Sequence, residues 1–154
     1  MTAHTYSWVG DTFYDDRRHL IATVAGSPLT VDGQLTVGDT TYRITKTGGR
    51  DFRLRADGGG VTFIFTTASF TTNRLEAMCG SRHYILRRPR PWNPARTITT
   101  RDGTNHGTIT RTFSPRSGAT IKVELTGADI PNAHLAFLAY GCRLVDADTT
   151  NIKI

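Results

Sequence analysis

The residues best suited to chemistry lie in one arginine-rich stretch, SRHYILRRPRPWNPAR, at positions 81 to 96. Arginines and aromatic side chains alternate along it: Arg82, Arg87, Arg88, Arg90 and Arg96, with Tyr84 and Trp92. Guanidinium groups match the oxygen atoms of a phosphate, and an exposed tryptophan suits a nucleobase or a lipid interface. The stretch therefore predicts a site for an anionic group. The alternative is an ordinary solvated edge, in which Trp92 packs inward and the arginines pair with carboxylates.

A second group of arginines alternates with apolar residues in two neighbouring segments, Thr41 to Lys46 and Asp51 to Asp57. A period of two residues is typical of a β-strand with one buried face. The glycine pair between the segments indicates a hairpin turn. In such a hairpin Arg43, Arg53 and Arg55 share one outward face, which predicts a second basic patch.

The sequence contains no recognisable catalytic constellation. It has no nucleophile elbow, P-loop, HExxH motif or dinucleotide fingerprint. Its five histidines are scattered along the chain. Cys79 and His83 have the spacing of two zinc ligands, but no second pair accompanies them. We therefore expect a non-enzymatic protein without a metal or cofactor.

Composition indicates one folded domain over residues 1–154, with 38% hydrophobic and 21% charged residues. The net charge of +6 permits attraction to nucleic acid or to an acidic membrane surface, although an arginine-rich but merely soluble surface has the same charge. Two cysteines are too few for a disulfide framework. Without a signal sequence or a stretch of transmembrane length, the chain is expected in the cytoplasm, with peripheral membrane contact if it binds lipid.

The elements that would position these residues are organised around Pro131 to Val145, PNAHLAFLAYGCRLV, the only long apolar run. At about 100° per residue its apolar side chains point all round a helix, which leaves no face for water. About 13 helical residues rise only ~20 Å, too short to span a bilayer. Asp129 is the expected N-cap, Asp146 and Asp148 are expected to begin the exit, and the last four residues are read as a strand.

About ten short strands separated by Gly, Asp-Gly and Pro signals precede this helix. The stretch from Asp11 to His19 is read as a loop or one helical turn, and Asp32-Gly33 as a hairpin turn. The segment from Val61 to Thr66 is expected to be buried on both sides or nearly so. A barrel closed around the helix is favoured over a sandwich, because only a barrel lumen lines an all-round apolar helix completely.

This layout resembles the tubby C-terminal-like superfamily, which includes phospholipid scramblases and LURP-one-related proteins. The residues that carry the resemblance are TITTRDGTNHGTITRTF, from Thr97 to Phe113, and the terminal run PNAHLAFLAYGCRLVD. The resemblance implies a closed antiparallel barrel of about twelve strands around a central helix. It also implies recognition of phosphoinositide head groups by basic outer side chains. The chain lacks the cysteine cluster and calcium ligands of scramblases, so calcium-dependent scrambling is not expected.

The function expected from the sequence is therefore a binding module for anionic phospholipid head groups or an acidic partner. One alternative is a nucleic-acid-binding β-protein, which requires several exposed aromatic residues for stacking. The other is an enzyme or small-ligand binder with a pocket in the barrel lumen, which a filled lumen argues against.

Overall fold

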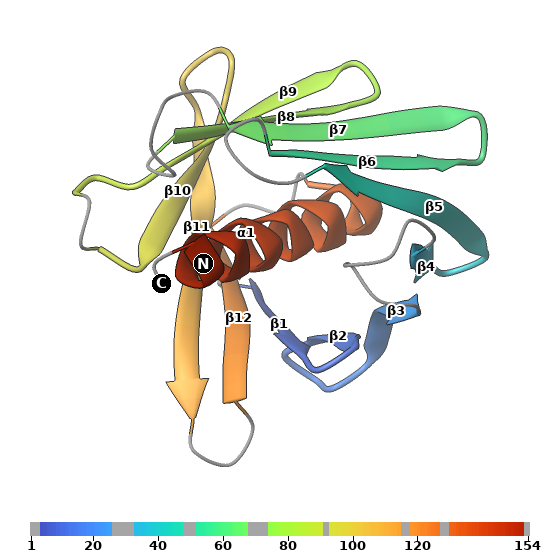
Figure 1. The fold of residues 1–154 in the computed structure, drawn as a ribbon, viewed down its shortest axis with the longest axis horizontal. Coiled ribbons are helices and arrows are strands. Elements are labelled where there is room, and N and C mark those ends of the chain that lie inside the picture. The colour runs from blue at the N-terminus through green and yellow to red at the C-terminus, as the bar shows by residue number, and fades with distance from the viewer. Residues whose placement is uncertain are drawn as a thin grey trace.

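A ring of antiparallel strands surrounds one helix in the computed structural model, which describes residues 4–25, 33–47, 52–67, 74–90, 93–114, 118–126 and 130–152. These residues form twelve strands and one helix. Their bounds are β1 His4–Val9, β2 Thr12–Asp15, β3 Leu20–Ala25, β4 Gly33–Val37, β5 Thr40–Thr47, β6 Arg53–Gly58, β7 Val61–Thr67, β8 Arg74–Cys79, β9 Arg82–Arg87, β10 Ala95–Thr100, β11 Asn105–Ser114, β12 Gly118–Leu125 and α1 Asn132–Ile152. The predicted fold class, a closed barrel around a C-terminal helix, is confirmed (Figure 1).

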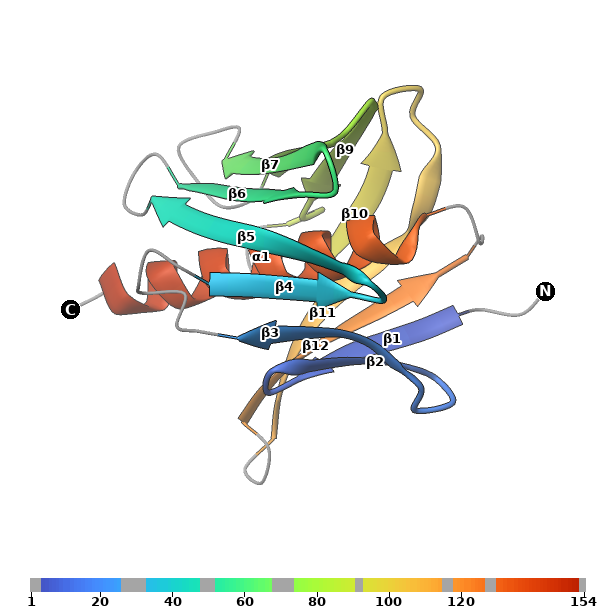
Figure 2. The same cartoon turned by 90° about the vertical axis from the view of Figure 1, so that its right-hand side faces the viewer.

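The strands follow an up-and-down order. Each pairs with its neighbours in the chain, and β1 pairs with β12 to close the ring, with Trp8 opposite Ile121. This order places every turn at one of two ends of the barrel. We call the end with the turns at Gly38, Gly59, Gly80 and Gly103 the helix-start end, because β12 finishes and α1 begins there. At the opposite, helix-exit end the last turns of α1 extend past the strands (Figure 2).

Alternating side chains of the strands fill the lumen. As predicted, Tyr42 and Ile44 point inward on β5, and Leu54 and Ala56 on β6. The inward positions predicted on β12 are also buried, namely Ile121, Val123 and Leu125.

The prediction that the β7 segment is buried on both sides is wrong. Phe63 and Phe65 are buried, whereas Thr62, Ile64 and Thr66 on the other face are half-buried. The reason is geometric, because a single closed sheet around a filled lumen has one dry face and one wet face.

The helix is buried all round, as the sequence predicts. Every residue from Leu135 to Tyr140 is at most 4% exposed. Aromatic side chains of the strands pack on it: the ring of Phe63 lies 5.5 Å from that of Phe137, and Trp8 lies 5.6 Å from Tyr140. The indole Nε1 of Trp8 also donates a buried 3.1 Å hydrogen bond to the carbonyl of Ala136. The helix is thus fixed to β1 by a specific polar contact as well as by apolar packing.

The helix is longer than predicted. It continues through Asp146 and Asp148, where an exit was expected, to Ile152. Asn151 and Ile152 are therefore helical and not part of a last strand. No glycine or proline follows Val145 to end the helix. At its start the carbonyl of Pro131 accepts the first helical hydrogen bond, from the N–H of Leu135 at 3.0 Å; the predicted cap, Asp129, lies outside the described residues.

Two strand predictions also require correction. The segment read as a loop or helical turn contains β2, whose Phe13 is fully buried beside Trp8. Gly33, read as part of a turn, is the first residue of β4 and lies opposite Ile44. Asp15 ends β2 and Gly33 begins β4, although both residue types favour turns. In each case pairing with the neighbouring strand outweighs the local preference for a turn.

Gly141 allows the helix and the barrel wall to approach closely. A Cβ atom built on Gly141 would lie 2.6 Å from Cδ2 of Phe65, well inside van der Waals contact. The Phe65 ring therefore rests directly on the helix backbone. The sequence alone does not predict this contact, because a glycine within a helix indicates only low helix propensity.

We expect Gly141→Ala to destabilise the protein by about 1–3 kcal/mol, since the added methyl overpacks the contact with Phe65. The sign is diagnostic, because the same change at an open helical position stabilises by about 1 kcal/mol. Urea unfolding of the purified variant measures the effect. The matched control is Gly33→Ala, where the added Cβ meets no atom closer than 3.7 Å and the midpoint should hardly move. A stabilised Gly141→Ala variant would contradict the packing described.

Candidate functional site

The structure separates the arginines that the sequence placed in one site. Arg82 is the first residue of β9 and Arg87 the last. At about 3.3 Å per residue the two Cα atoms lie ~17 Å apart, at opposite ends of the barrel. Arg82 belongs to the helix-start end, and Arg87, Arg88 and Arg90 belong to the helix-exit end.

Arg96 was predicted as part of the anionic-ligand surface, and this is wrong, because its side chain is only 1% exposed. The cause is that β10 begins at Ala95, two residues before the predicted strand, so that Arg96 falls in step with the inward-pointing Ile98. Trp92, the aromatic residue of the predicted site, lies outside the described residues.

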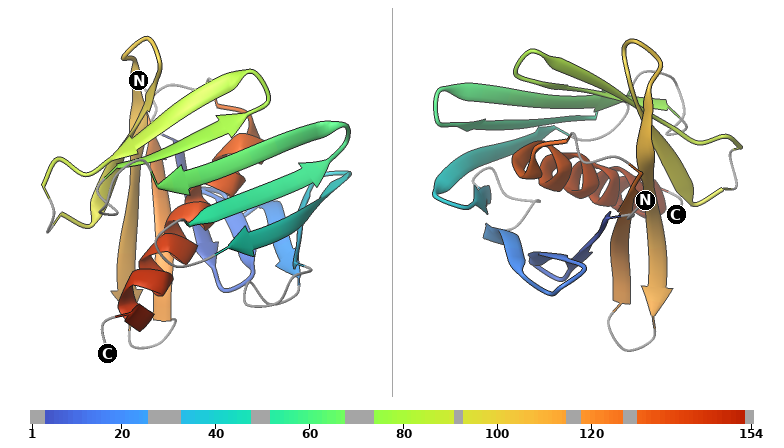
Figure 3. Two further views of the ribbon diagram at one scale, coloured as in Figure 1. Left: turned by 45° about the horizontal axis from the view of Figure 1, so that its top comes forward. Right: turned by 180° about the vertical axis from the view of Figure 1, so that it is seen from behind.

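The arginines at the helix-exit end form a larger group than predicted. Arg74, which was not among the predicted site residues, lies directly opposite Arg87 in the β8–β9 pair. Arg53 begins β6, and Arg111 lies on the β11–β12 hairpin that projects from the barrel (Figure 3). We call this group the basic rim: Arg53, Arg74, Arg87, Arg88, Arg90 and Arg111. Five of the six are exposed and Arg88 is half-buried.

Charge is unevenly distributed along the barrel axis. Of the carboxylate side chains that the structure describes, only Asp11, in the β1–β2 turn, lies at the helix-exit end. Glu76, within β8, is engaged by Nε2 of His83 at 2.9 Å. The other described carboxylates gather at the helix-start end among arginines that offset them: Asp15, Asp16, Asp39, Asp57, Asp102 and Glu124. Among the described side chains, arginines therefore outnumber carboxylates at the helix-exit end.

The predicted pairing of the second patch is confirmed. Arg43 lies opposite Asp57, Arg55 opposite Thr45, and Arg53 next along the same strand, all exposed on the outer face. The patch is not uniformly basic, however. Nε of Arg55 meets Oδ2 of Asp57 at 2.9 Å, and a hydrogen bond from Thr62, together with Arg55, lowers the pKa of Asp57. Of the three arginines in this patch, only Arg53 lies toward the helix-exit end.

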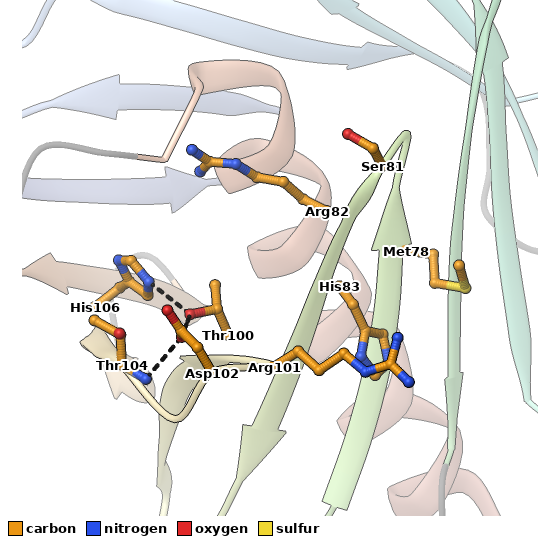
Figure 4. A pocket seen from close by; sticks show the side chains of 9 residues that line it. All are labelled: Met78, Ser81, Arg82, His83, Thr100, Arg101, Asp102, Thr104 and His106. Carbon is orange, nitrogen blue, oxygen red and sulfur yellow. Dashed lines mark hydrogen bonds between the residues drawn. The ribbon is translucent and has the colours of Figure 1, made fainter.

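Arg82 lines a groove between two hairpins at the helix-start end. The groove has a volume of about 740 Å³ and lies between the β8–β9 and β10–β11 turns (Figure 4). Eight of the nine residues that line it carry a polar or charged group, and their aliphatic and ring carbons also face the groove: Met78, Ser81, Arg82, His83, Thr100, Arg101, Asp102, Thr104 and His106. Sequence reasoning missed it, because no local pattern shows that these two turns are neighbours.

A hydrogen-bond chain links Arg82, at the edge of this groove, to the helix. Nη1 of Arg82 lies 3.4 Å from the hydroxyl oxygen of Tyr84, and that oxygen lies 2.8 Å from Nδ1 of His134 on α1. Arginine only donates, so the Tyr84 oxygen accepts from Arg82, and the tautomer of His134 sets which group donates in the second bond. Burial lowers the pKa of His134 below its ordinary value of 6.5, and the charge of Arg82 lowers it further.

The β10–β11 turn is similarly well defined. Oδ1 of Asp102 accepts the Thr100 hydroxyl at 2.6 Å and the backbone N–H of Thr104 at 3.0 Å. These bonds lower the pKa of Asp102 to about 2. Because the Thr100 proton goes to Asp102, Nε2 of His106 donates to the Thr100 oxygen at 3.1 Å. Asp102 thus stabilises the turn that contains Arg101.

Cys79 and His83, the pair with zinc-ligand spacing, point to opposite faces of the sheet. Cys79 is buried, which raises the pKa of its thiol to about 12, and it lies opposite Arg82. His83 lies opposite the exposed Met78 on the outer face. The two residues therefore cannot share a metal ion.

The lowered pKa of His134 predicts pH-dependent stability. As the pH falls below about 6.5, the unfolded chain binds a proton at this residue before the folded protein does, so the free energy of unfolding decreases. His134→Asn keeps an acceptor for Tyr84 but cannot titrate. Urea unfolding between pH 8 and pH 5 should show a flatter profile for this variant than for the parent. Identical profiles would contradict the lowered pKa of His134 in the folded protein.

Comparisons with known proteins leave the function to be argued from this geometry. No family model, curated protein or solved structure matches the chain. Within the described residues, no helix combines the length and the apolar character needed to cross a membrane. The tubby-like resemblance remains a prediction.

Proposed function

We propose that the protein is a non-enzymatic binding module whose basic rim docks on the anionic head groups of a phospholipid surface. The observation that carries the proposal is the segregation of charge, with arginines at the helix-exit end and most described carboxylates at the other. A binding role is also favoured by the lumen, which α1 and the inward side chains occupy.

A planar anionic surface suits this distribution better than a small ligand does. The arginines of the basic rim belong to four strands and the β9–β10 connection, so a plane at the helix-exit end meets several of them together. The carboxylates of the opposite end lie roughly a strand length away, ~17 Å, or about two Debye lengths at physiological ionic strength. They therefore offset little of the attraction at the surface.

Nucleic acid binding, the first alternative, is less well supported. Stacking on bases requires exposed aromatic side chains. The exposed large apolar side chains of the described residues are Val9, Leu20, Val61 and Met78, none of them aromatic. The described residues therefore support recognition of phosphate by charge better than stacking on bases.

The test is co-sedimentation with vesicles of phosphatidylcholine alone, with added phosphatidylserine, and with added phosphoinositide, at low and physiological salt. We expect binding that requires anionic lipid and weakens with salt. In Arg74→Gln/Arg87→Gln the affinity should fall about 30-fold, at ~1 kcal/mol per arginine near the surface. Removing these two facing charges leaves the fold intact, since like charges opposite each other are destabilising.

The matched control is Arg17→Gln/Arg18→Gln, which removes the same charge from the exposed β2–β3 turn at the helix-start end and should retain most of the binding. Equal loss in both variants would show an effect of net charge only and would refute docking through the rim. Binding to single-stranded DNA or RNA but to no vesicle would replace the proposal with the nucleic-acid alternative.

A further inference from the structure

A hollow that shares no residue with the basic rim or with the groove at Arg82 lies on the outer face of β1. We call it the β1 trough. Its volume is about 640 Å³, which falls in the range of small-molecule sites. Thr5, Ser7 and Val9 line it from β1, on one face because successive side chains of a strand alternate between faces. This row is ~13 Å long, so the trough can take an elongated molecule.

The sizes of neighbouring side chains explain why the surface is hollowed here. Ser7 lies opposite Tyr14 on β2 and opposite Lys122 on β12. Both of these neighbours have long side chains, whereas the side chain of serine ends at its hydroxyl. Tyr14 also lines the trough and is half-buried. The trough therefore has a floor of small hydroxyl side chains and one aromatic wall.

The charged residues of the trough nearly balance one another. They belong to the end of β2 and to the turn that follows it: Asp15, Asp16 and Arg18. Oδ1 of Asp15 accepts the backbone N–H groups of Arg17 and His19, at 2.9 and 2.8 Å, so this carboxylate stabilises its own turn. The exposed Asp16 and Arg18 then offer one charge of each sign. Such a lining favours a neutral ligand over an anion or a cation.

The lining suits a neutral molecule that has both hydroxyl groups and a rigid apolar face. The hydroxyls of Thr5 and Ser7 can donate and accept hydrogen bonds, Asp16 accepts them and Arg18 donates them. The face of the Tyr14 ring carries partial negative charge, which attracts C–H groups that lie flat against it. A sugar has hydroxyls around its edge and C–H groups on the faces of its ring. A purely apolar molecule would leave the polar side chains of the trough unpaired.

We propose that the β1 trough binds a short neutral oligosaccharide, with Tyr14 stacking on one sugar ring and Ser7 as the floor beneath the chain. The length of the trough favours several linked sugars over a single one. None of the arginines of the basic rim lines the trough, so this proposal and the proposed docking on anionic lipid can fail independently.

The experiment is a titration of the ¹⁵N-labelled full chain with cellotetraose and with maltotetraose, followed by amide chemical shifts. Sorbitol is the control ligand, since it has the hydroxyls of a sugar but no rigid ring. We expect saturable shifts in residues 5–9 and 12–18 with at least one of the two oligosaccharides, and none with sorbitol. The absence of saturable shifts with both oligosaccharides, or an equal response to sorbitol, would overturn the proposal.

Two pairs of variants test the roles of the floor and the wall. Ser7→Leu fills the trough and should weaken binding about tenfold or more, whereas Thr41→Leu adds the same bulk at an exposed position on β5 and should bind like the parent. Tyr14→Ala should weaken binding about fivefold, whereas Tyr14→Phe keeps the ring face and should retain most of the affinity. Unchanged amide shifts in β5 to β9 establish that each variant is folded. Parent-like affinity in folded Ser7→Leu and Tyr14→Ala would refute binding in the trough.

Discussion

An apolar helix with no face for water must be surrounded on every side, and this requirement dominates the structure. One sheet satisfies it by closing on itself, so that every strand contributes inward side chains to one core. Trp8 and Phe65 show how closely the two parts fit, the first through a hydrogen bond to Ala136 and the second by resting on Gly141. Because packed side chains fill the lumen, a binding partner has access only to the outer surface and the two ends of the barrel.

The two ends carry different chemistry because successive strands alternate in direction. In an up-and-down barrel the first residue of one strand and the last residue of the next meet at the same end. Arg74 and Arg87 are brought together in this way, as are the turns that carry Arg82 and Arg101. A basic rim and a concave groove thus lie at opposite ends of one small domain.

The sequence was sufficient for the fold class and for much of the burial pattern, because the all-round apolar run and the alternation in β5, β6 and β12 report directly on packing. It was insufficient for the site. Arg82 and Arg96 looked like parts of one cluster, but the strand boundaries that place one at the groove and bury the other depend on pairing with distant strands. Arg74 and His134 gain their roles only through partners across a hairpin or across the lumen. Contacts of that kind have no local signature.

The up-and-down order also has a consequence for how the chain folds. Eleven of the twelve strand pairings join neighbours in sequence and can form early as local hairpins, whereas β1 and β12 must meet from far ends of the described chain. The helix follows all of these strands in the sequence and ends up inside the ring that they form. Closure before the helix has docked would shut it out, so we expect the β1–β12 seam to form last. Until the seam forms, the open sheet has two unpaired edge strands and exposed apolar residues. We therefore expect closure to be slow and the open sheet to be prone to aggregation.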